Sequence, residues 1–148
     1  MRRSVIGAAV NAPTSEPSLI RQRVRILVVE ENGRLLRALL RFLATEPAVE
    51  VVGWAGSPDE AIVQAAQLDP ELVLIDGSLP RAAVAQACWL MRVRPAAPKI
   101  VALLNDDEVS YRASAGALGA DALLAKARLT EALLPLLREL FPTRWPQA

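Results

Sequence analysis

The sequence contains no histidine and a single cysteine, Cys88. The absence of histidine excludes Ser-His-Asp and Cys-His catalysis and argues against a zinc site. One cysteine cannot form a disulfide within the chain, which favours a reducing cytoplasm as its location. Cys88 lies in the apolar stretch 85–91, so we expect a buried thiol on a helix rather than a reactive one.

Long hydrophobic runs and an excess of charge are also absent. No apolar run approaches the length of a membrane-spanning helix, and the formal net charge is +1. A balanced charge creates no field that draws the protein to nucleic acid or to anionic lipid. We therefore expect neither direct nucleic-acid binding nor membrane association. The N-terminal MRRSVIGAAVNAP is interpreted as a tail rather than a signal peptide, because its apolar stretch is short.

The residues that are present indicate one compact domain. Hydrophobic residues make up 53% of the 148 residues and aromatic residues only 4%, a composition typical of helices packed on a buried sheet. Residues 1–22 contain Pro13, Pro17 and several small polar residues without periodicity, and are predicted to be a flexible extension. The folded domain is predicted at 23–141, followed by a tail at 142–148.

Short apolar runs alternate with segments of helical periodicity from residue 23 onward. Strands are predicted at 24–29, 50–55, 71–75, 99–104 and 121–125. Helices are predicted at 34–44, 57–68, 83–93 and 107–118, with a last helix after Thr130. This alternation predicts an α/β fold with a five-stranded parallel sheet and helices on both faces.

Local signals support several of these boundaries. Ser57 and Glu60 form the Ser-x-x-Glu capping pattern, with Pro58 in the first helical turn. Thr130 is predicted to cap the last helix, in which Pro135 should remove a backbone hydrogen bond. Trp54 and Trp89 are predicted to be partly buried in contacts between helices and the sheet, rather than to bind a ligand. Trp145 is predicted to be a loose side chain at the C-terminus.

Charged residues follow the predicted strands. Glu30 and Glu31 come after the first strand, Asp76 after the third and Lys126 after the fifth. The carboxyl ends of parallel strands lie along one edge of a sheet, so these groups should meet if the first and third strands are neighbours. Crowded carboxylates repel one another unless a cation joins them, and Mg²⁺ prefers such oxygen ligands. A carboxylate nucleophile, a metal ion and a lysine together suit phosphoryl transfer.

Four motifs in order resemble the receiver domain of bacterial two-component response regulators over about 24–140. They are VVEEN, VVGWAGSPDEA, PELVLIDGSLP and GADALLAK. The resemblance implies a flavodoxin-like (CheY-like) fold with strand order 2-1-3-4-5. It also implies a phosphate-accepting signalling protein with at most weak autophosphorylation and autodephosphorylation activity, rather than an enzyme.

The resemblance further implies roles for individual residues. Asp76 would accept the phosphoryl group and Lys126 would contact it. Mg²⁺ would be held by Glu30, Glu31, Asp76 and the backbone carbonyl of Ser78. The partners implied are a sensor histidine kinase or phosphotransfer protein, a downstream protein and, in some members, a second copy in a homodimer.

The sequence departs from the family pattern at the positions that transmit phosphorylation. Leu104 stands where a Thr or Ser hydroxyl is usual, and Asn105 where a small residue is usual. On the fifth strand, Leu123 replaces the usual aromatic residue. Asn105 is a candidate hydrogen-bond donor to phosphate, whereas Leu104 can serve only in packing.

Three functions from different classes remain open at this stage. The first is a stand-alone phosphorylatable receiver, favoured by Glu30, Glu31, Asp76 and Lys126. The second is a pseudo-receiver, a protein-binding module without the switch, favoured by the three departures. The third is a flavodoxin-like electron carrier or other enzyme on the same fold, which the segment EENGR after the first strand disfavours because it is not a phosphate-binding loop.

Overall fold

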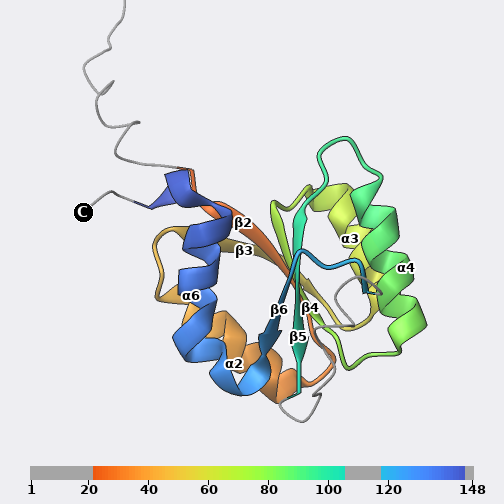
Figure 1. Cartoon of the computed structure of the whole chain (residues 1–148), viewed down its shortest axis with the longest axis horizontal. Coiled ribbons are helices and arrows are strands. Elements are labelled where there is room, and N and C mark those ends of the chain that lie inside the picture. The colour runs from red at the N-terminus through yellow and green to blue at the C-terminus, as the bar shows by residue number, and fades with distance from the viewer. Residues whose placement is uncertain (1–21, 106–117, 146–148) are drawn as a thin grey trace, which may run out of the picture.

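The computed structural model describes residues 22–105 and 118–145, and these residues form the predicted α/β arrangement (Figure 1). The elements are β2 (Val24–Val29), α2 (Gly33–Ala44), β3 (Val49–Ala55), α3 (Pro58–Leu68), β4 (Leu72–Asp76), α4 (Arg81–Arg92), β5 (Lys99–Leu104), β6 (Ala122–Ala125) and α6 (Leu129–Leu140). Short 3₁₀ helices lie at Lys126–Arg128 and Pro142–Arg144. The helix predicted at 107–118 falls outside the described residues, apart from Leu118.

The five strands form one parallel sheet in the order β3-β2-β4-β5-β6. This is the predicted order 2-1-3-4-5, so β2 and β4 are neighbours and their carboxyl ends lie side by side. Helices α2 and α6 cover one face of the sheet, and α3 and α4 cover the other (Figure 1). No helix within the described ranges is long and apolar enough to cross a membrane.

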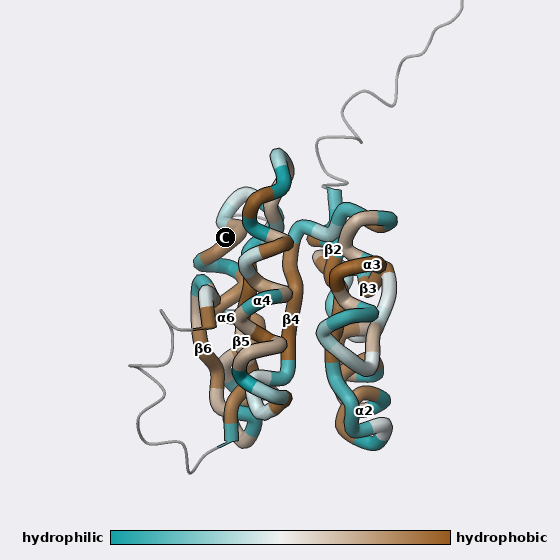
Figure 2. Tube along the Cα trace, turned by 90° about the vertical axis from the view of Figure 1, so that its right-hand side faces the viewer, coloured by the Kyte–Doolittle hydropathy of each residue, from teal (hydrophilic) through white to brown (hydrophobic). Residues whose placement is uncertain are grey.

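The central strands are buried on both faces, which explains their uninterrupted hydrophobic sequences. All five residues of β4 are buried, and the hydrophobic colour follows this strand along its length (Figure 2). Alternate residues enter two cores: Val73 and Ile75 pack on the α3–α4 side, Leu72 and Leu74 on the α2–α6 side. Full burial of each such side chain stabilises the folded state by about 1.5–3 kcal/mol. The sheet therefore holds in place the residues that directly follow its strands.

Helix caps agree with the sequence at α3 and disagree at α6. The Ser57 side chain accepts a hydrogen bond from Glu60 N, as predicted, while Glu60 Oε1 accepts from Gly56 N at 2.7 Å. The cap prediction at Thr130 was wrong: α6 begins at Leu129, with Arg128 in the N-cap position. The 3₁₀ turn at Lys126–Arg128 leads directly into the helix, so Thr130 lies inside its first turn.

The three tryptophans lie in environments that the sequence did not predict. The side chains of Trp54 and Trp89 are 55% and 62% exposed, so the prediction of partly buried contacts was wrong for both. A register shift in the pairing of β2 with β3 lies beside Trp54, and such bulges re-aim side chains. Trp145 is buried and donates from Nε1 to Glu46 Oε1 at 3.0 Å, so it is not a loose terminal side chain.

Candidate functional site

Asp76 is the last residue of β4 and begins a tight turn. Its Oδ1 accepts hydrogen bonds from Ser78 N at 2.9 Å and Ser78 Oγ at 2.6 Å. A carboxylate that accepts from the backbone two residues ahead forms an Asx turn, which fixes the rotamer of the aspartate. Asp76 is nonetheless 4% exposed, so the turn holds a buried charge at the end of the sheet.

Lys126 and Glu30 complete the charged cluster around Asp76. Lys126 Nζ lies 2.9 Å from Asp76 Oδ1 and 3.9 Å from Glu30 Oε1. Glu30 directly follows β2, is 2% exposed, and accepts from Asn32 N through Oε2 at 3.1 Å. These carboxylates meet because β2 and β4 are adjacent, and Lys126 reaches them from the end of β6.

The two buried carboxyl groups respond to this environment in opposite directions. Burial raises the pKa of Glu30, and the neighbouring carboxylate of Asp76 raises it further, against the opposing donation from Asn32 N. Burial also acts to raise the pKa of Asp76, but the hydrogen bonds from Ser78 and Lys126 outweigh it and lower the pKa. Asp76 is therefore the more acidic of the two carboxyl groups.

The predicted site residues line a single cavity of about 470 Å³. Its walls are Glu30, Glu31, Asn32, Asp76, Ser78 and Lys126. The residues predicted to hold the metal, together with Lys126, are thus present in it, whereas Asn105, the further candidate donor to phosphate, is not among the lining residues. Two lining groups were not predicted, namely the Ser78 hydroxyl and the Asn32 side chain. The sequence Asp-Gly-Ser is typical of an Asx turn and could have indicated that the Ser78 hydroxyl lies beside Asp76.

One atom of the cavity favours a bound cation. Glu30 Oε1 is buried and has no hydrogen-bond partner, although the region is crowded with charge. With both carboxylates ionised, the cluster of Glu30, Asp76 and Lys126 carries a net negative charge, which a divalent cation would balance. Within the described ranges no three carboxylate, His or Cys side chains form a ligand cluster, so the cavity offers two buried carboxylates. Mg²⁺ is commonly held by one or two carboxylates with waters, so these residues fit it.

The three atypical positions lie outside the lining of this cavity. Leu104 ends β5 and is buried, and a Cβ atom built on Gly77 would lie 2.3 Å from Leu104 Cδ2. Leu104 therefore packs against the backbone that follows Asp76. Leu123 packs against the α3–α4 core, and Asn105 is exposed just beyond β5.

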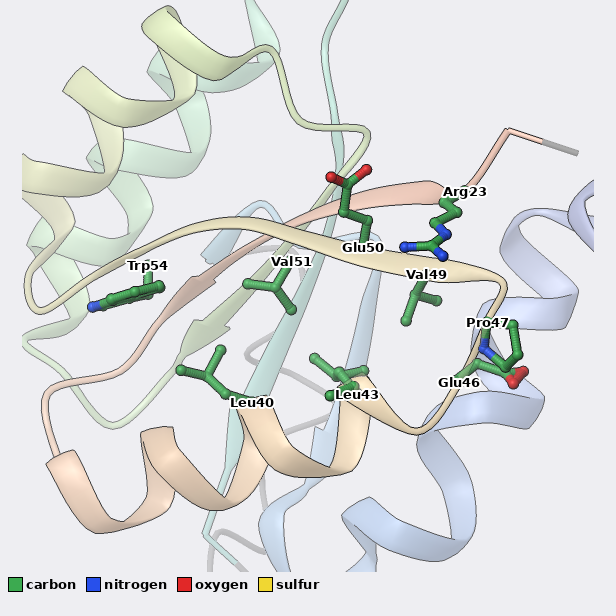
Figure 3. Close-up of a pocket in the computed structure, with 10 residues that line it drawn as sticks. Arg23, Leu40, Leu43, Glu46, Pro47, Val49, Glu50, Val51 and Trp54 are labelled. Atoms are coloured by element: carbon green, nitrogen blue, oxygen red, sulfur yellow. The ribbon is translucent and has the colours of Figure 1, made fainter.

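A second groove, of about 390 Å³, lies between α2 and the edge strand β3 (Figure 3). Leu40, Leu43 and Val51 contribute apolar side chains to it, and Trp54 lies at one end. Its charged residues are Arg23, Glu46 and Glu50. It shares no lining residue with the cavity around Glu30, Asp76 and Lys126, called the acidic cavity below, and presents no comparable cluster of buried charge, so the acidic cavity is the candidate site.

Comparison with known sequences agrees with this geometry. The family model for the response regulator receiver domain matches residues 26–138. A protein-glutamate methylesterase/protein-glutamine glutaminase of Anaeromyxobacter dehalogenans is 33% identical over 106 residues, which are 71% of this chain and 31% of that protein. A protein of the same description from Geobacter sulfurreducens is 29% identical over 96 residues, which are 62% of this chain and 25% of that protein. The chain therefore spans about a third or less of the curated relatives it matches.

Solved structures share the fold. The response regulator domain of Thermotoga maritima CheB superposes with a TM-score of 0.69 at 18% identity, covering 85% of this chain and all of that one. CheY6 from R. sphaeroides, in the structure of its complex with the P1 domain of CheA3, gives 0.69 at 22% identity, with 82% and 99% covered. At these identities the similarity shows the fold alone.

Proposed function

Because this chain belongs to the response regulator receiver domain family of two-component systems, we propose that it accepts a phosphoryl group on Asp76 in a phosphorelay. The observation that carries this proposal is the buried, ionised Asp76 carboxylate, held at the end of β4 by Ser78 and Lys126 beside Glu30. A structural loop cap has no need of burial, a lysine partner and a second buried carboxylate.

The chemistry is a displacement at phosphorus. A carboxylate oxygen of Asp76 attacks the phosphorus of a phosphohistidine or of a small acyl phosphate, and an O–P bond forms as the bond to the leaving group breaks. The electron pair leaves with the imidazole, which takes up a proton, or with the carboxylate of the acyl donor. The lowered pKa of Asp76 keeps the nucleophile ionised, and Lys126 offers positive charge to the phosphoryl oxygens.

We propose that Mg²⁺ binds at Glu30 and Asp76, with Glu31 acting through water and the Ser78 carbonyl completing the protein ligands. Glu30 Oε1, which is buried and accepts no hydrogen bond, supports this assignment. The metal would neutralise charge on the phosphoryl group as it transfers. Without Mg²⁺, Lys126 is the positive group that the described part of the cavity provides to balance the charges of Glu30 and Asp76. An incoming phosphoryl group adds more negative charge, so we expect phosphorylation to depend on the metal.

A sensor histidine kinase or phosphotransfer protein is the proposed donor, and a downstream protein the proposed recipient of the signal. The complex of CheY6 with a CheA3 domain supports a partner of this kind. We propose a cytoplasmic location, signalling through protein–protein contacts of the receiver itself, and a homodimer as one form of output.

A pseudo-receiver is the second candidate, and one observation favours it. Leu104 ends β5 without a hydroxyl and is packed against Gly77, so it cannot follow a phosphoryl group by hydrogen bonding. A pseudo-receiver would bind its protein partner without being phosphorylated.

The intact mass of the protein after incubation with acetyl phosphate separates the two candidates. We expect a gain of one phosphoryl group with Mg²⁺ and none with EDTA. Asp76→Asn should abolish the gain, whereas Asp59→Asn, at an exposed position in α3, should retain it. A folded wild-type protein that gains no mass would overturn the phosphorelay proposal in favour of the pseudo-receiver.

A further inference from the structure

Three hydrogen-bond donors converge on one oxygen of Asp76. Ser78 N and Lys126 Nζ each lie 2.9 Å from Oδ1, and Ser78 Oγ lies 2.6 Å from it. Among the described residues that line the acidic cavity, Ser78 is the one that carries a hydroxyl. This hydroxyl already lies at hydrogen-bond distance from the carboxylate that we propose as the nucleophile.

The end of β5 contributes no donor from its side chain. Leu104 is 1% exposed, and its Cδ2 is so close to Gly77 that a Cβ atom there would lie 2.3 Å away. An aliphatic side chain held this tightly can neither donate a hydrogen bond nor be displaced easily. Among the described residues, the side chains that donate to Asp76 are those of Ser78 and Lys126.

A phosphoryl group needs more donors than a carboxylate does. It brings close to two negative charges and three acceptor oxygens, each of which is stabilised by hydrogen bonding. Ser78 is exposed, so its side chain can turn from Oδ1 toward a new acceptor without repacking the core. Its backbone N–H, fixed by the Asx turn, keeps the residue beside Asp76 as it does so.

We propose that the Ser78 hydroxyl donates a hydrogen bond to the phosphoryl group during transfer to Asp76, supplying from the β4–α4 turn the hydroxyl that Leu104 does not supply from β5. This inference rests on the proposed function of Asp76 and extends it. Ser78 thereby becomes a phosphoryl-binding residue, with Lys126 as the charged donor on the same group.

The test is the rate of phosphorylation by acetyl phosphate at saturating Mg²⁺, measured by intact mass for wild type, Ser78→Ala and Ser78→Thr. We expect Ser78→Ala to lose about tenfold in rate, as a hydrogen bond to a charged group predicts. Ser78→Thr keeps a hydroxyl and should recover most of it. The urea midpoint of each variant is measured alongside, and we expect that of Ser78→Ala to fall only by the loss of one hydrogen bond to Asp76, so that every variant is folded in the rate assay.

The matched control is Thr45→Ala, which removes a hydroxyl bonded to the Phe42 carbonyl at the end of α2 and should leave the rate unchanged. A Ser78→Ala rate equal to or above that of wild type would overturn the inference while leaving Asp76 as the acceptor. Equal loss in Ser78→Ala and Ser78→Thr would also overturn it, because the hydroxyl would then not be the group that matters. Absence of phosphorylation in wild type would instead contradict the proposed function itself.

Discussion

At the scale of single residues, the contact between Gly77 and Leu104 links the turn after Asp76 to the neighbouring strand. A Cβ atom on Gly77 would meet Leu104 Cδ2 at 2.3 Å and the Leu103 carbonyl oxygen at 3.2 Å. Gly77 N also donates to that carbonyl at 2.7 Å, which limits how far the backbone can retreat. Glycine is therefore required here by close approach rather than by a left-handed conformation.

Gly77→Ala is accordingly predicted to destabilise the protein by ~1–3 kcal/mol through overpacking. The cost should shrink by at least ~1 kcal/mol when Leu104→Ala is already present, because the clashing methyl group is gone. Urea unfolding of wild type, both single variants and the double variant measures this coupling. Gly56→Ala, whose Cβ would lie 3.6 Å from Glu60 Oε1, is the control, with a change below ~0.5 kcal/mol. Purely additive effects of the two substitutions would contradict the proposed contact.

The sequence identified the charged residues of the site but misplaced the tryptophans. Glu30, Asp76 and Lys126 could be found because each follows a strand, and parallel strands bring their carboxyl ends together. The environment of Trp145 depends on Glu46, 99 residues away, and on the packing of α6, neither of which has a local signal. Trp54 follows a register shift in the pairing of β2 with β3, a local irregularity that apolar periodicity does not reveal.

At the scale of elements, strand positions were predicted more closely than helix starts. The strands at 24–29 and 99–104 agree with the structure at both ends, because a β-branched or apolar run buried on both faces has sharp limits. The start of α6 was missed because a 3₁₀ turn replaces the usual side-chain cap. Helix α4 likewise begins at Arg81 after Pro80, without a side-chain cap, and so gave no start signal.

Pro135 inside α6 provides a test at this scale. Proline has no backbone N–H, so the helix lacks the hydrogen bond from position 135 to the Glu131 carbonyl. Pro135→Ala is predicted to raise the free energy of unfolding by about 1–3 kcal/mol, measured by urea titration. Thr130→Ala, in the first turn, should cause no loss, because Thr130 is not the cap. Unchanged or reduced stability in Pro135→Ala would show that the helix is not limited by this proline.

At the scale of the whole molecule, residues after α6 contact the amino-terminal ends of β2 and β4. This end of the sheet lies opposite the acidic cavity. Arg144 forms a bidentate ion pair with Glu71, which immediately precedes β4, and donates to the Arg23 carbonyl at 3.3 Å. The segment thereby joins the start of β2, the start of β4 and the end of α6. Sequence periodicity cannot predict such a contact, because it joins residues more than 70 positions apart.

This ion pair predicts a pH dependence of stability. The hydrogen bonds from Arg144 lower the pKa of Glu71 in the folded state, so the stabilisation is complete above the unfolded pKa of about 4.3. It is lost as the pH falls through the lower, folded pKa. Wild type should therefore exceed Glu71→Gln by about 1 kcal/mol in unfolding free energy at pH 7, a difference that disappears in acid. Urea titrations from pH 7 to pH 3 measure it.

The exposed Glu139 in α6 gives the matched substitution, Glu139→Gln, for which no such pH-dependent difference is expected. If the gap between wild type and Glu71→Gln stayed constant down to pH 3, the ion pair would not be its cause.

Topology was the part of the molecule that sequence reasoning predicted best. Strictly alternating strands and helices leave few arrangements, and the observed order β3-β2-β4-β5-β6 is the one implied by the receiver resemblance. That order makes β2 and β4 neighbours, which brings Glu30 beside Asp76. The hydrogen bonds that lower the pKa of Asp76 could not be predicted, because they depend on side-chain rotamers around the Asx turn.

Chemical identification of the phosphorylated residue shows whether Asp76 is the acceptor. The protein is phosphorylated with acetyl phosphate and Mg²⁺, reduced with borohydride to convert the acyl phosphate to homoserine, and digested for peptide mass spectrometry. We expect homoserine at position 76 and no reduced carboxyl group elsewhere, with none formed when Mg²⁺ is removed. Homoserine at Asp121, 2-amino-5-hydroxypentanoate (the reduction product of a glutamyl phosphate) at Glu30, or no reduced residue in a folded protein would contradict the assignment of Asp76.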